Sequence, residues 1–172
     1  MSDEAELARY VEARRTSLDA NDPAALHTEA IIDAVQGVMD CLDGLSPDEL
    51  DWRPATGSGN SLAILAAHVL GSAEEKILEF FGGQSVGRVR DREFVTGAAQ
   101  ASAVLERWTE VKTSFPGVVA ALPPEAWDTP SGRGDLAQLT GRALLLLVHR
   151  HASEHLGEAQ LIRDLILARR PG

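Results

Sequence analysis

The chain has 172 residues and a mass of 18.4 kDa, a length that suits one domain with a substantial hydrophobic core. Hydrophobic residues make up 44% and charged residues 24% of it, which excludes a disordered chain or a disulfide scaffold. The 16 basic residues are outnumbered by 26 acidic ones, giving a net charge of −10. Because this charge repels phosphate backbones and anionic lipids, we expect no nucleic-acid partner.

Cysteine usage and apolar runs indicate the compartment. The single cysteine, Cys41, cannot form an internal disulfide, and the first ten residues are acidic where a secretory signal is basic and then apolar. The longest uninterrupted apolar run, residues 143–148, is far shorter than the roughly 20 residues that span a bilayer. We therefore expect a cytoplasmic protein with no membrane partner.

Apolar residues recur at helical spacing, whereas the alternation typical of strands is scarce and only 5% of residues are aromatic. Residues 1–22 form a predicted N-terminal helical extension, whose narrow apolar stripe comprises Leu7, Tyr10, Val11 and Leu18. This stripe needs cover, either from a second copy of the chain, which predicts a homodimer, or from packing on its own bundle.

Four longer helices are predicted in the domain that covers residues 23–172: residues 24–43, 61–81, 98–122 and 136–168. The fold class is therefore all-α, a four-helix bundle with an additional N-terminal helix. The connections have about a dozen residues or more, which is long enough to cross the end of a bundle. The loop lengths thus leave the topology open.

Several details of these helices follow from single residues. Asn60 is the expected N-cap of the second helix, and Pro116 is expected to end or kink the third. The last helix contains a stretch, residues 144–148, that is apolar all round and is therefore expected to be buried. Expected inward-facing residues are Ile31, Val35, Val38 and Leu42 on the first helix, and Val104, Leu105, Trp108, Val111 and Phe115 on the third.

Histidines are the residues best suited to chemistry in this sequence. On the last helix His151 and His155 lie about 40° apart on one face, while His149 points about 200° away from His151. His68, in the middle of the second helix, shares a face with Ser72 and Glu75 and can point inward from a neighbouring helix.

Three neutral imidazoles from two helices can bind one divalent ion and leave a coordination position open, as in catalytic sites. We therefore interpret His68, His151 and His155 as metal ligands. The alternative is that His68 is a core histidine satisfied by a hydrogen bond, and that the i, i+4 spacing of His151 and His155 arises by chance. Imidazole suits zinc, nickel, iron and manganese, so the residue types alone do not select the metal.

The segment from His151 to His155 also matches the H-x-x-E-H signature of zinc peptidases. We interpret this match as accidental, because only 17 residues follow His155 and such peptidases need a further ligand well downstream. Glu158 lies on the face of His151, about 20° away, where it supports an imidazole or is simply solvated.

The ordered set of these motifs resembles the DinB-like family of helical-bundle metalloenzymes. The resemblance covers about residues 24–168 and depends on Trp52-Arg53-Pro54, on the mid-helix His68, and on H-x-x-x-H followed by a small residue and Glu or Gln. In that family the metal ligands are one histidine on the second helix and two residues one turn apart on the last. Carried over, these are His68, His151 and His155.

The resemblance implies a divalent metal, zinc or nickel before iron or manganese, and a reaction that transfers or isomerises with a low-molecular-weight thiol such as mycothiol, bacillithiol or glutathione. Since the chain has no cysteine near the ligand motifs, the thiol would arrive as a co-substrate. The alternatives are a non-catalytic bundle that binds a metal or another ligand and, less favoured, a metal-dependent hydrolase.

Other residues carry weaker expectations. Cys41 lies off the inward stripe of the first helix and is expected to be a buried or half-buried structural thiol. Trp52 and Trp127 are expected to close the ends of the bundle, and Arg53 to bind a carboxylate or form a structural salt bridge. The loop arginines Arg88, Arg90 and Arg92 are expected to solubilise their loop or to contribute to a co-substrate site.

Overall fold

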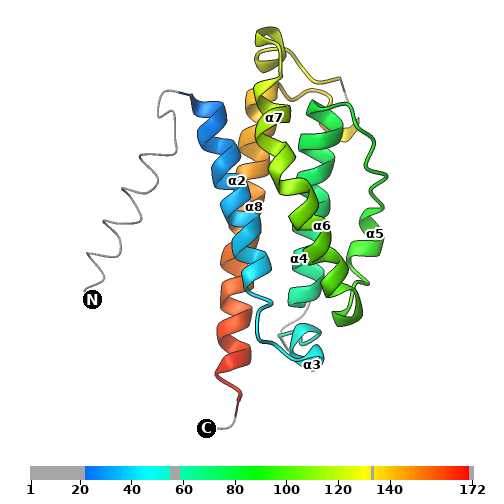
Figure 1. Ribbon diagram of the computed structural model, residues 1–172, viewed down its shortest axis with the longest axis vertical. Helices are drawn as coiled ribbons and strands as arrows, with labels where there is room; N and C mark the ends of the chain where they lie inside the picture. The colour runs from blue at the N-terminus through cyan, green and yellow to red at the C-terminus, as the bar shows by residue number, and fades with distance from the viewer. Residues whose placement is uncertain (1–21, 55–58, 133, 171–172) are drawn as a thin grey trace, which may run out of the picture.

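A computed structural model describes residues 22–54, 59–132 and 134–170, and throughout these ranges the regular secondary structure is helical (Figure 1). This confirms the all-α prediction. The predicted N-terminal extension, with its stripe from Leu7 to Leu18, lies outside the described residues. The homodimer inferred from that stripe therefore stays a prediction.

The bundle consists of four long helical segments. These are α2 (Pro23–Asp40), α4 (Leu62–Glu74), α6 (Ala101–Val111) with α7 (Phe115–Ala120), and α8 (Gly141–Leu167). Two short helices, α3 (Pro47–Leu50) and α5 (Arg90–Glu93), lie in the connections. A π-helical segment, Glu75–Phe81, continues α4, and 3₁₀ turns cover Ala98–Gln100, Lys112–Ser114, Pro124–Trp127 and Gly134–Leu136.

The chain direction settles the topology that the loop lengths left open. The colour order in Figure 1 shows α2 and α8 running one way, and α4 and the α6–α7 pair running the opposite way. The connection that contains α5 therefore returns along the length of the bundle between two parallel helices. Helix α8 packs against both α2 and α4. It runs parallel to α2 and antiparallel to α4.

Side-chain caps fix where the long helices begin. Asp22 caps α2 by accepting a hydrogen bond of 2.9 Å from the Ala24 amide, and Pro23 follows at the first helical position. Helix α4 is capped by Ser61, whose hydroxyl accepts from the Ile64 amide, and not by Asn60 as predicted. Thr140 caps α8, which therefore begins five residues later than the predicted start at 136.

The predicted third helix is interrupted where the sequence contains Pro116. The α-helix ends at Val111, a 3₁₀ turn covers Lys112–Ser114, and a new helix begins at Phe115. Proline has no amide hydrogen, so the α-helical hydrogen bond to the carbonyl of residue 112 cannot form. The interruption is thus the kink that the sequence predicts.

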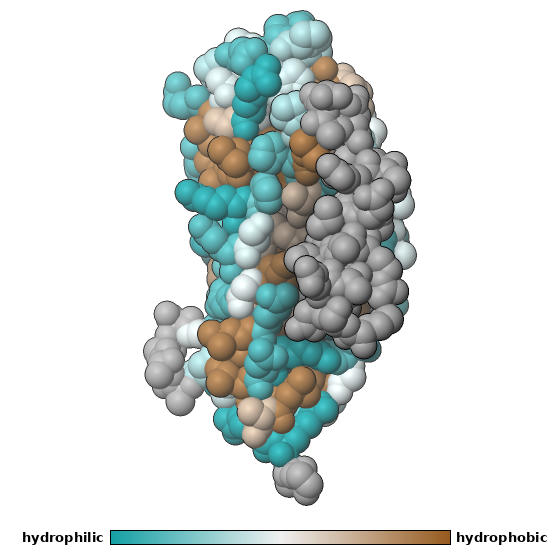
Figure 2. All heavy atoms as spheres, turned by 90° about the vertical axis from the view of Figure 1, so that its left-hand side faces the viewer, coloured by the Kyte–Doolittle hydropathy of each residue, from teal (hydrophilic) through white to brown (hydrophobic). Residues whose placement is uncertain are grey.

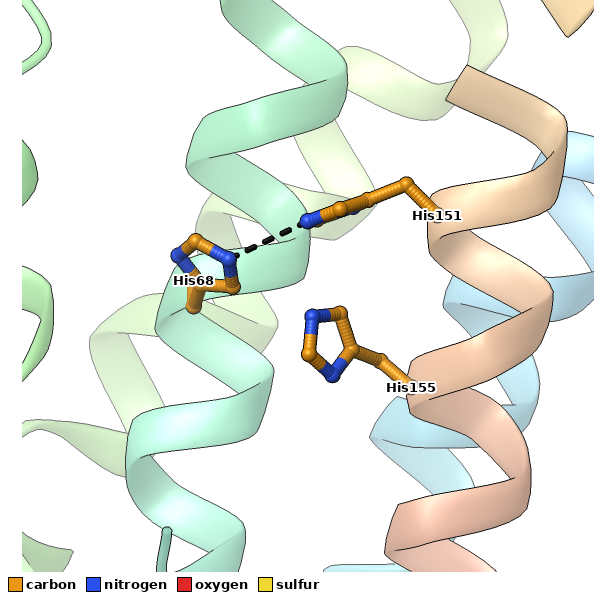
Figure 3. Close-up of side chains that lie close together, drawn as sticks. All are labelled: His68, His151 and His155. Carbon is orange, nitrogen blue, oxygen red and sulfur yellow. Dashed lines mark hydrogen bonds between the residues drawn. The ribbon is translucent and has the colours of Figure 1, made fainter. Parts of the chain in front are cut away.

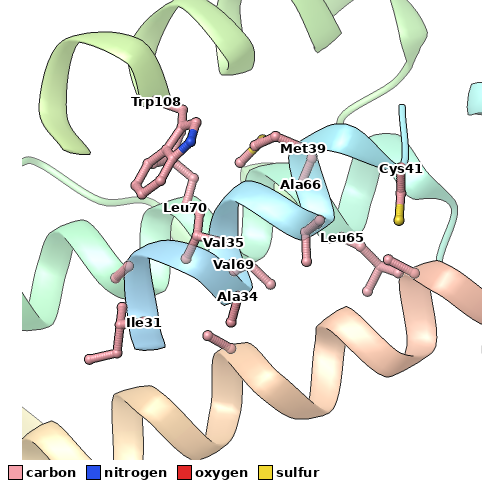
Figure 4. Packing of buried hydrophobic residues seen from close by; sticks show 14 of the residues in the cluster. Ile31, Ala34, Val35, Met39, Cys41, Leu65, Ala66, Val69, Leu70 and Trp108 are labelled. Carbon is pink, nitrogen blue, oxygen red and sulfur yellow. The ribbon is translucent and has the colours of Figure 1, made fainter. Parts of the chain in front are cut away.

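The core lies between α2, α4, α6 and α8, and it contains most of the residues expected to face inward. Figure 4 shows the buried side chains of α2 and α4 facing one another, with Trp108 of α6 beside them. The Trp108 indole is buried, and its N–H donates to Oε1 of Gln36 at 2.8 Å, so this buried donor is satisfied. The predicted inward residues Ile31, Val35, Val38, Leu42, Trp108, Val111 and Phe115 are all buried.

Two apolar residues do not lie where their patterns predict. Leu105 was expected to face the core but is 37% exposed, and Leu146, in the stretch expected to be buried all round, is 55% exposed. Helix α8 packs mainly against α2 and α4, and its residues Leu146, Leu161 and Leu165 remain exposed. The apolar run of α8 is therefore longer than its buried face.

The surface carries hydrophobic residues in separate patches. On the side of the bundle that carries α2, Figure 2 shows such patches among hydrophilic residues.

Along the described parts of the chain, each helix is too short or too polar to serve as a membrane span.

Adjacent leucines on α8 provide a matched test of this packing. Leu145 is 2% exposed and Leu146 is 55% exposed. We expect Leu145→Ala to lower the free energy of unfolding by about 2–5 kcal/mol, because it removes buried contacts and leaves a cavity. Leu146→Ala should change it by less than about 0.5 kcal/mol. Denaturant unfolding followed by circular dichroism measures both values, and equal losses would contradict the orientation of α8.

Candidate metal centre

Three histidines converge between α4 and α8. His68 projects from α4, and His151 and His155 project from successive turns of α8 toward it (Figure 3). One ring nitrogen of each residue lies within 4.8 Å of the others, and the Nε2 atoms of His68 and His151 are 3.2 Å apart. The structure therefore brings together all three residues predicted from the sequence as ligands.

The local sequence explains this convergence. The i, i+4 spacing places His151 and His155 one above the other on α8, with ring centroids 4.6 Å apart. His68 lies in the middle of α4, which is buried over most of its length and packs directly on α8. Two close-packed antiparallel helices thus hold the three imidazoles at one level of the bundle.

A buried carboxylate fixes the orientation of His68. Oε2 of Glu93, at the end of α5, lies 2.8 Å from Nδ1 of His68. Burial raises the pKa of Glu93, but hydrogen bonds from Arg88 and His68 outweigh it and hold the pKa below its usual value. Because an ionised carboxylate can only accept, His68 Nδ1 carries the hydrogen, and Nε2 keeps its lone pair toward the other histidines.

The other two imidazoles are also prepared for ligation. Nδ1 of His155 lies 2.9 Å from Oε2 of Glu158, which leaves Nε2 of His155 free in the same way. Burial, and then the proximity of His155 and His68, lower the pKa of His151 to about 3. His151 is therefore neutral at pH 7. Glu158 thus contacts an imidazole, which is one of the two roles that the sequence predicts for it.

The donor set fits a divalent transition-metal ion. Neutral imidazole nitrogens are good ligands for zinc, nickel, iron and manganese, and a carboxylate behind a ligating histidine is a common support. Three protein ligands also leave room for water or a substrate, in contrast to closed structural sites with four. The three imidazoles have the chemistry that such an ion requires.

A cavity of about 580 Å³ opens beside the histidines. His68 and His151 form part of its wall, and Ser72 and Glu75, which were predicted to share the face of His68, also line it. The π-helical segment Glu75–Phe81 supplies further wall residues, including Lys76 and Phe80. A small polar molecule in this cavity would lie next to the histidine nitrogens.

Charged groups beside His68 and the cavity compensate one another. Arg88 donates to Glu93 through Nε at 2.6 Å and to Glu75 through Nη1 at 2.7 Å. Lys76 is buried and donates to Glu75 at 3.1 Å and to the Ser72 hydroxyl at 3.1 Å. Two cations thus neutralise two carboxylates, so the cluster needs no external counter-ion.

The structure separates the three loop arginines that the sequence analysis treated together. Arg88 is largely buried in ion pairs, which contradicts its interpretation as a solubilising residue. Arg90 lines the cavity beside the histidines and lies over the Phe94 ring, 5.0 Å from its centroid. Arg92 lines a different cavity, of about 340 Å³, on another side of α4. Their different positions depend on the path of the loop, which spacing in the sequence does not reveal.

The remaining candidates lie away from the centre. Cys41 is buried, as predicted for a structural thiol. Burial raises the pKa of its thiol. Trp52 and Trp127 pack against the core, and Arg53 is exposed and does not line the cavity. Glu93 is the functional residue that sequence reasoning missed, since a glutamate in an arginine-rich loop gives no periodic signal.

Comparison with known proteins gives one family. A family model described as the DinB superfamily matches residues 30–159, which include His68, His151 and His155. Comparisons with curated proteins and with solved structures give no significant match.

His149 points away from the centre, as its angle predicts, and forms a second pair. Its Nδ1 lies 2.8 Å from Nδ1 of His27 on α2, so one imidazole donates to the other. Burial, and then the proximity of His27, lower the pKa of His149. The folded protein therefore favours neutral His149.

The His27–His149 pair should make stability sensitive to mild acid. A histidine whose pKa is lowered by folding contributes stability above its unfolded pKa, near 6.5, and loses it as the pH falls below that value. We expect the wild type to lose more free energy of unfolding between pH 7.5 and 5.5 than His149→Gln does. Denaturant titrations at both pH values test this, with His27→Gln as the matched variant. Equal losses in all three proteins would contradict it.

Proposed function

This chain belongs to the DinB superfamily, and from that premise we propose that it is a metal-dependent transferase that uses a low-molecular-weight thiol. One observation carries the proposal: three imidazole nitrogens lie within 4.8 Å of one another beside a cavity of about 580 Å³. The proposed ligands are His68, His151 and His155. Zinc and nickel are the metals that we place first, before iron and manganese.

The protein's own residues prepare the ligands. Glu93 holds His68, and Glu158 holds His155, each through Nδ1, so that Nε2 faces the centre. His151 is neutral without any ion pair, because burial disfavours its charged form. Nε2 of His151 lies 3.2 Å from Nε2 of His68, so both nitrogens face the centre of the cluster.

The chemistry of a thiol transferase suits a site without a protein cysteine. A divalent ion, when bound, lowers the pKa of a coordinated thiol so that the nucleophilic thiolate forms near neutral pH. Cys41 is buried outside the cavity lining and cannot serve as that nucleophile. The thiol would therefore come from a co-substrate, which the open side of the three-histidine cluster can admit.

The cavity wall also suits a polar co-substrate. Arg90 supplies an exposed positive group, while Phe80 and Leu147 supply apolar surface. Low-molecular-weight thiols carry carboxylate or hydroxyl groups, which a guanidinium group binds through charge-assisted hydrogen bonds. A non-catalytic metal-binding bundle is the alternative, and it requires the ion but no productive thiol complex.

Metal content is the first test. Protein purified without a polyhistidine tag should contain about one divalent ion per chain by elemental analysis. His151→Ala and His155→Ala should lose most of this metal, because each removes one of three ligands. His149→Ala is the matched control, since His149 lies on the same helix but faces His27. Metal content that is the same in all four proteins would refute the site.

Thiol chemistry is the second test. Metal-loaded protein is incubated with mycothiol, bacillithiol or glutathione and an electrophile, and thiol consumption is followed. We expect consumption that requires both the metal and His68, so His68→Ala should abolish it while Cys41→Ala leaves it unchanged. If calorimetry detects no binding of any of these thiols to the metal-loaded protein, the non-catalytic bundle becomes the better interpretation.

A further inference from the structure

We infer that Gly71 is a positioning residue, whose missing side chain admits the Glu93 carboxylate that orients His68. Gly71 lies one turn after His68 on α4, on the side from which Glu93 approaches. The effect on metal affinity depends on the proposed function. The effect on the His68 ring does not, because it concerns contacts within the metal-free protein.

The space that Glu93 occupies is the space that a side chain at position 71 would need. A Cβ atom built on Gly71 would lie 2.4 Å from Oε1 and 3.2 Å from Cδ of Glu93, and 3.4 Å from Nε of Arg88. The first distance is far shorter than any van der Waals contact. The glycine therefore lets the carboxylate lie directly against the backbone of α4.

A methyl group at position 71 would displace Glu93 and leave the helix in place. The three nearest heavy atoms outside the helix's own backbone belong to the side chains of Glu93 and Arg88, which can move. Alanine also has a higher helix propensity than glycine, so the backbone of α4 favours the substitution. The strain thus falls on the contacts of Glu93 with Arg88 and His68, which are 2.6 Å and 2.8 Å long.

Displacement of Glu93 would release the His68 ring. The bond from His68 Nδ1 to Glu93 is the contact that keeps the hydrogen on Nδ1 and the lone pair on Nε2. Without it the ring can rotate and either tautomer can form. Loss of such a carboxylate partner typically lowers metal affinity 10- to 100-fold.

The first experiment measures Zn²⁺ affinity by competition with a chromophoric chelator. We expect Gly71→Ala to bind Zn²⁺ about 10-fold more weakly than the wild type. Gly117→Ala is the matched control, because a Cβ at that helical glycine of α7 meets no atom within 4 Å. Affinity that is unchanged in Gly71→Ala would overturn the inference.

A double-mutant cycle with Glu93→Ala separates positioning from a general effect on the helix. Glu93→Ala should itself lower Zn²⁺ affinity 10- to 100-fold and should leave room for a methyl group at position 71. Gly71→Ala should then cause no further loss in that background, since the residue it displaces is gone. Equal losses in the two backgrounds would show that Gly71 acts independently of Glu93 and would overturn the inference.

The second readout needs no metal. Nitrogen-15 NMR of the metal-free protein reports which ring nitrogen of His68 carries the hydrogen. The wild type and Gly117→Ala should show the Nδ1–H form, whereas Gly71→Ala and Glu93→Ala should show a mixture of tautomers. A protein that binds no Zn²⁺ would refute the metal site yet leave this measurement intact. An unchanged His68 tautomer in Gly71→Ala would overturn the inference about Gly71 and leave the proposed metal site untouched.

Discussion

The contact between Glu93 and His68 determines which ring nitrogen of His68 carries the hydrogen and which one faces the other two histidines. A histidine between two packed helices can present either ring nitrogen, and a ligand site requires one particular choice. The ionised carboxylate makes that choice, because it accepts the Nδ1 hydrogen at 2.8 Å and leaves Nε2 as the acceptor. The orientation of one imidazole is therefore set by a residue from a distant loop, not by α4 itself.

That contact depends in turn on charge balance in a largely buried region. Arg88 holds Glu93 and Glu75 together, and Lys76 adds a second cation beside Glu75. A buried carboxylate without such partners would take up a proton and could no longer orient the imidazole. The crossover connection that contains Arg88 and Glu93 thus contributes both halves of this ion pair, in addition to joining two parallel helices of the bundle.

The fold was predictable because it depends on periodicity, which is local in sequence. Each apolar or histidine stripe lies on one face of one helix. Examples are Ile31, Val35 and Val38 on α2 and the i, i+4 histidine pair on α8. The exposed Leu146 shows where this prediction fails, because an apolar run alone does not indicate how many neighbouring helices will cover it. The three candidate ligands were likewise readable from helical angles. The contact between Gly71 and Glu93 was not, because residues 22 positions apart meet only through the course of the α5 loop.

We propose that one ion is bound by three imidazoles on α4 and α8. X-ray absorption spectroscopy of the metal that copurifies with the untagged protein tests it directly, since imidazole rings give a characteristic outer-shell scattering. We expect a first shell of nitrogen and oxygen atoms, with outer-shell scattering from three imidazoles in the wild type and from two in His155→Ala. A first shell that contains the Cys41 sulfur, or imidazole scattering unaffected by this substitution, would contradict it.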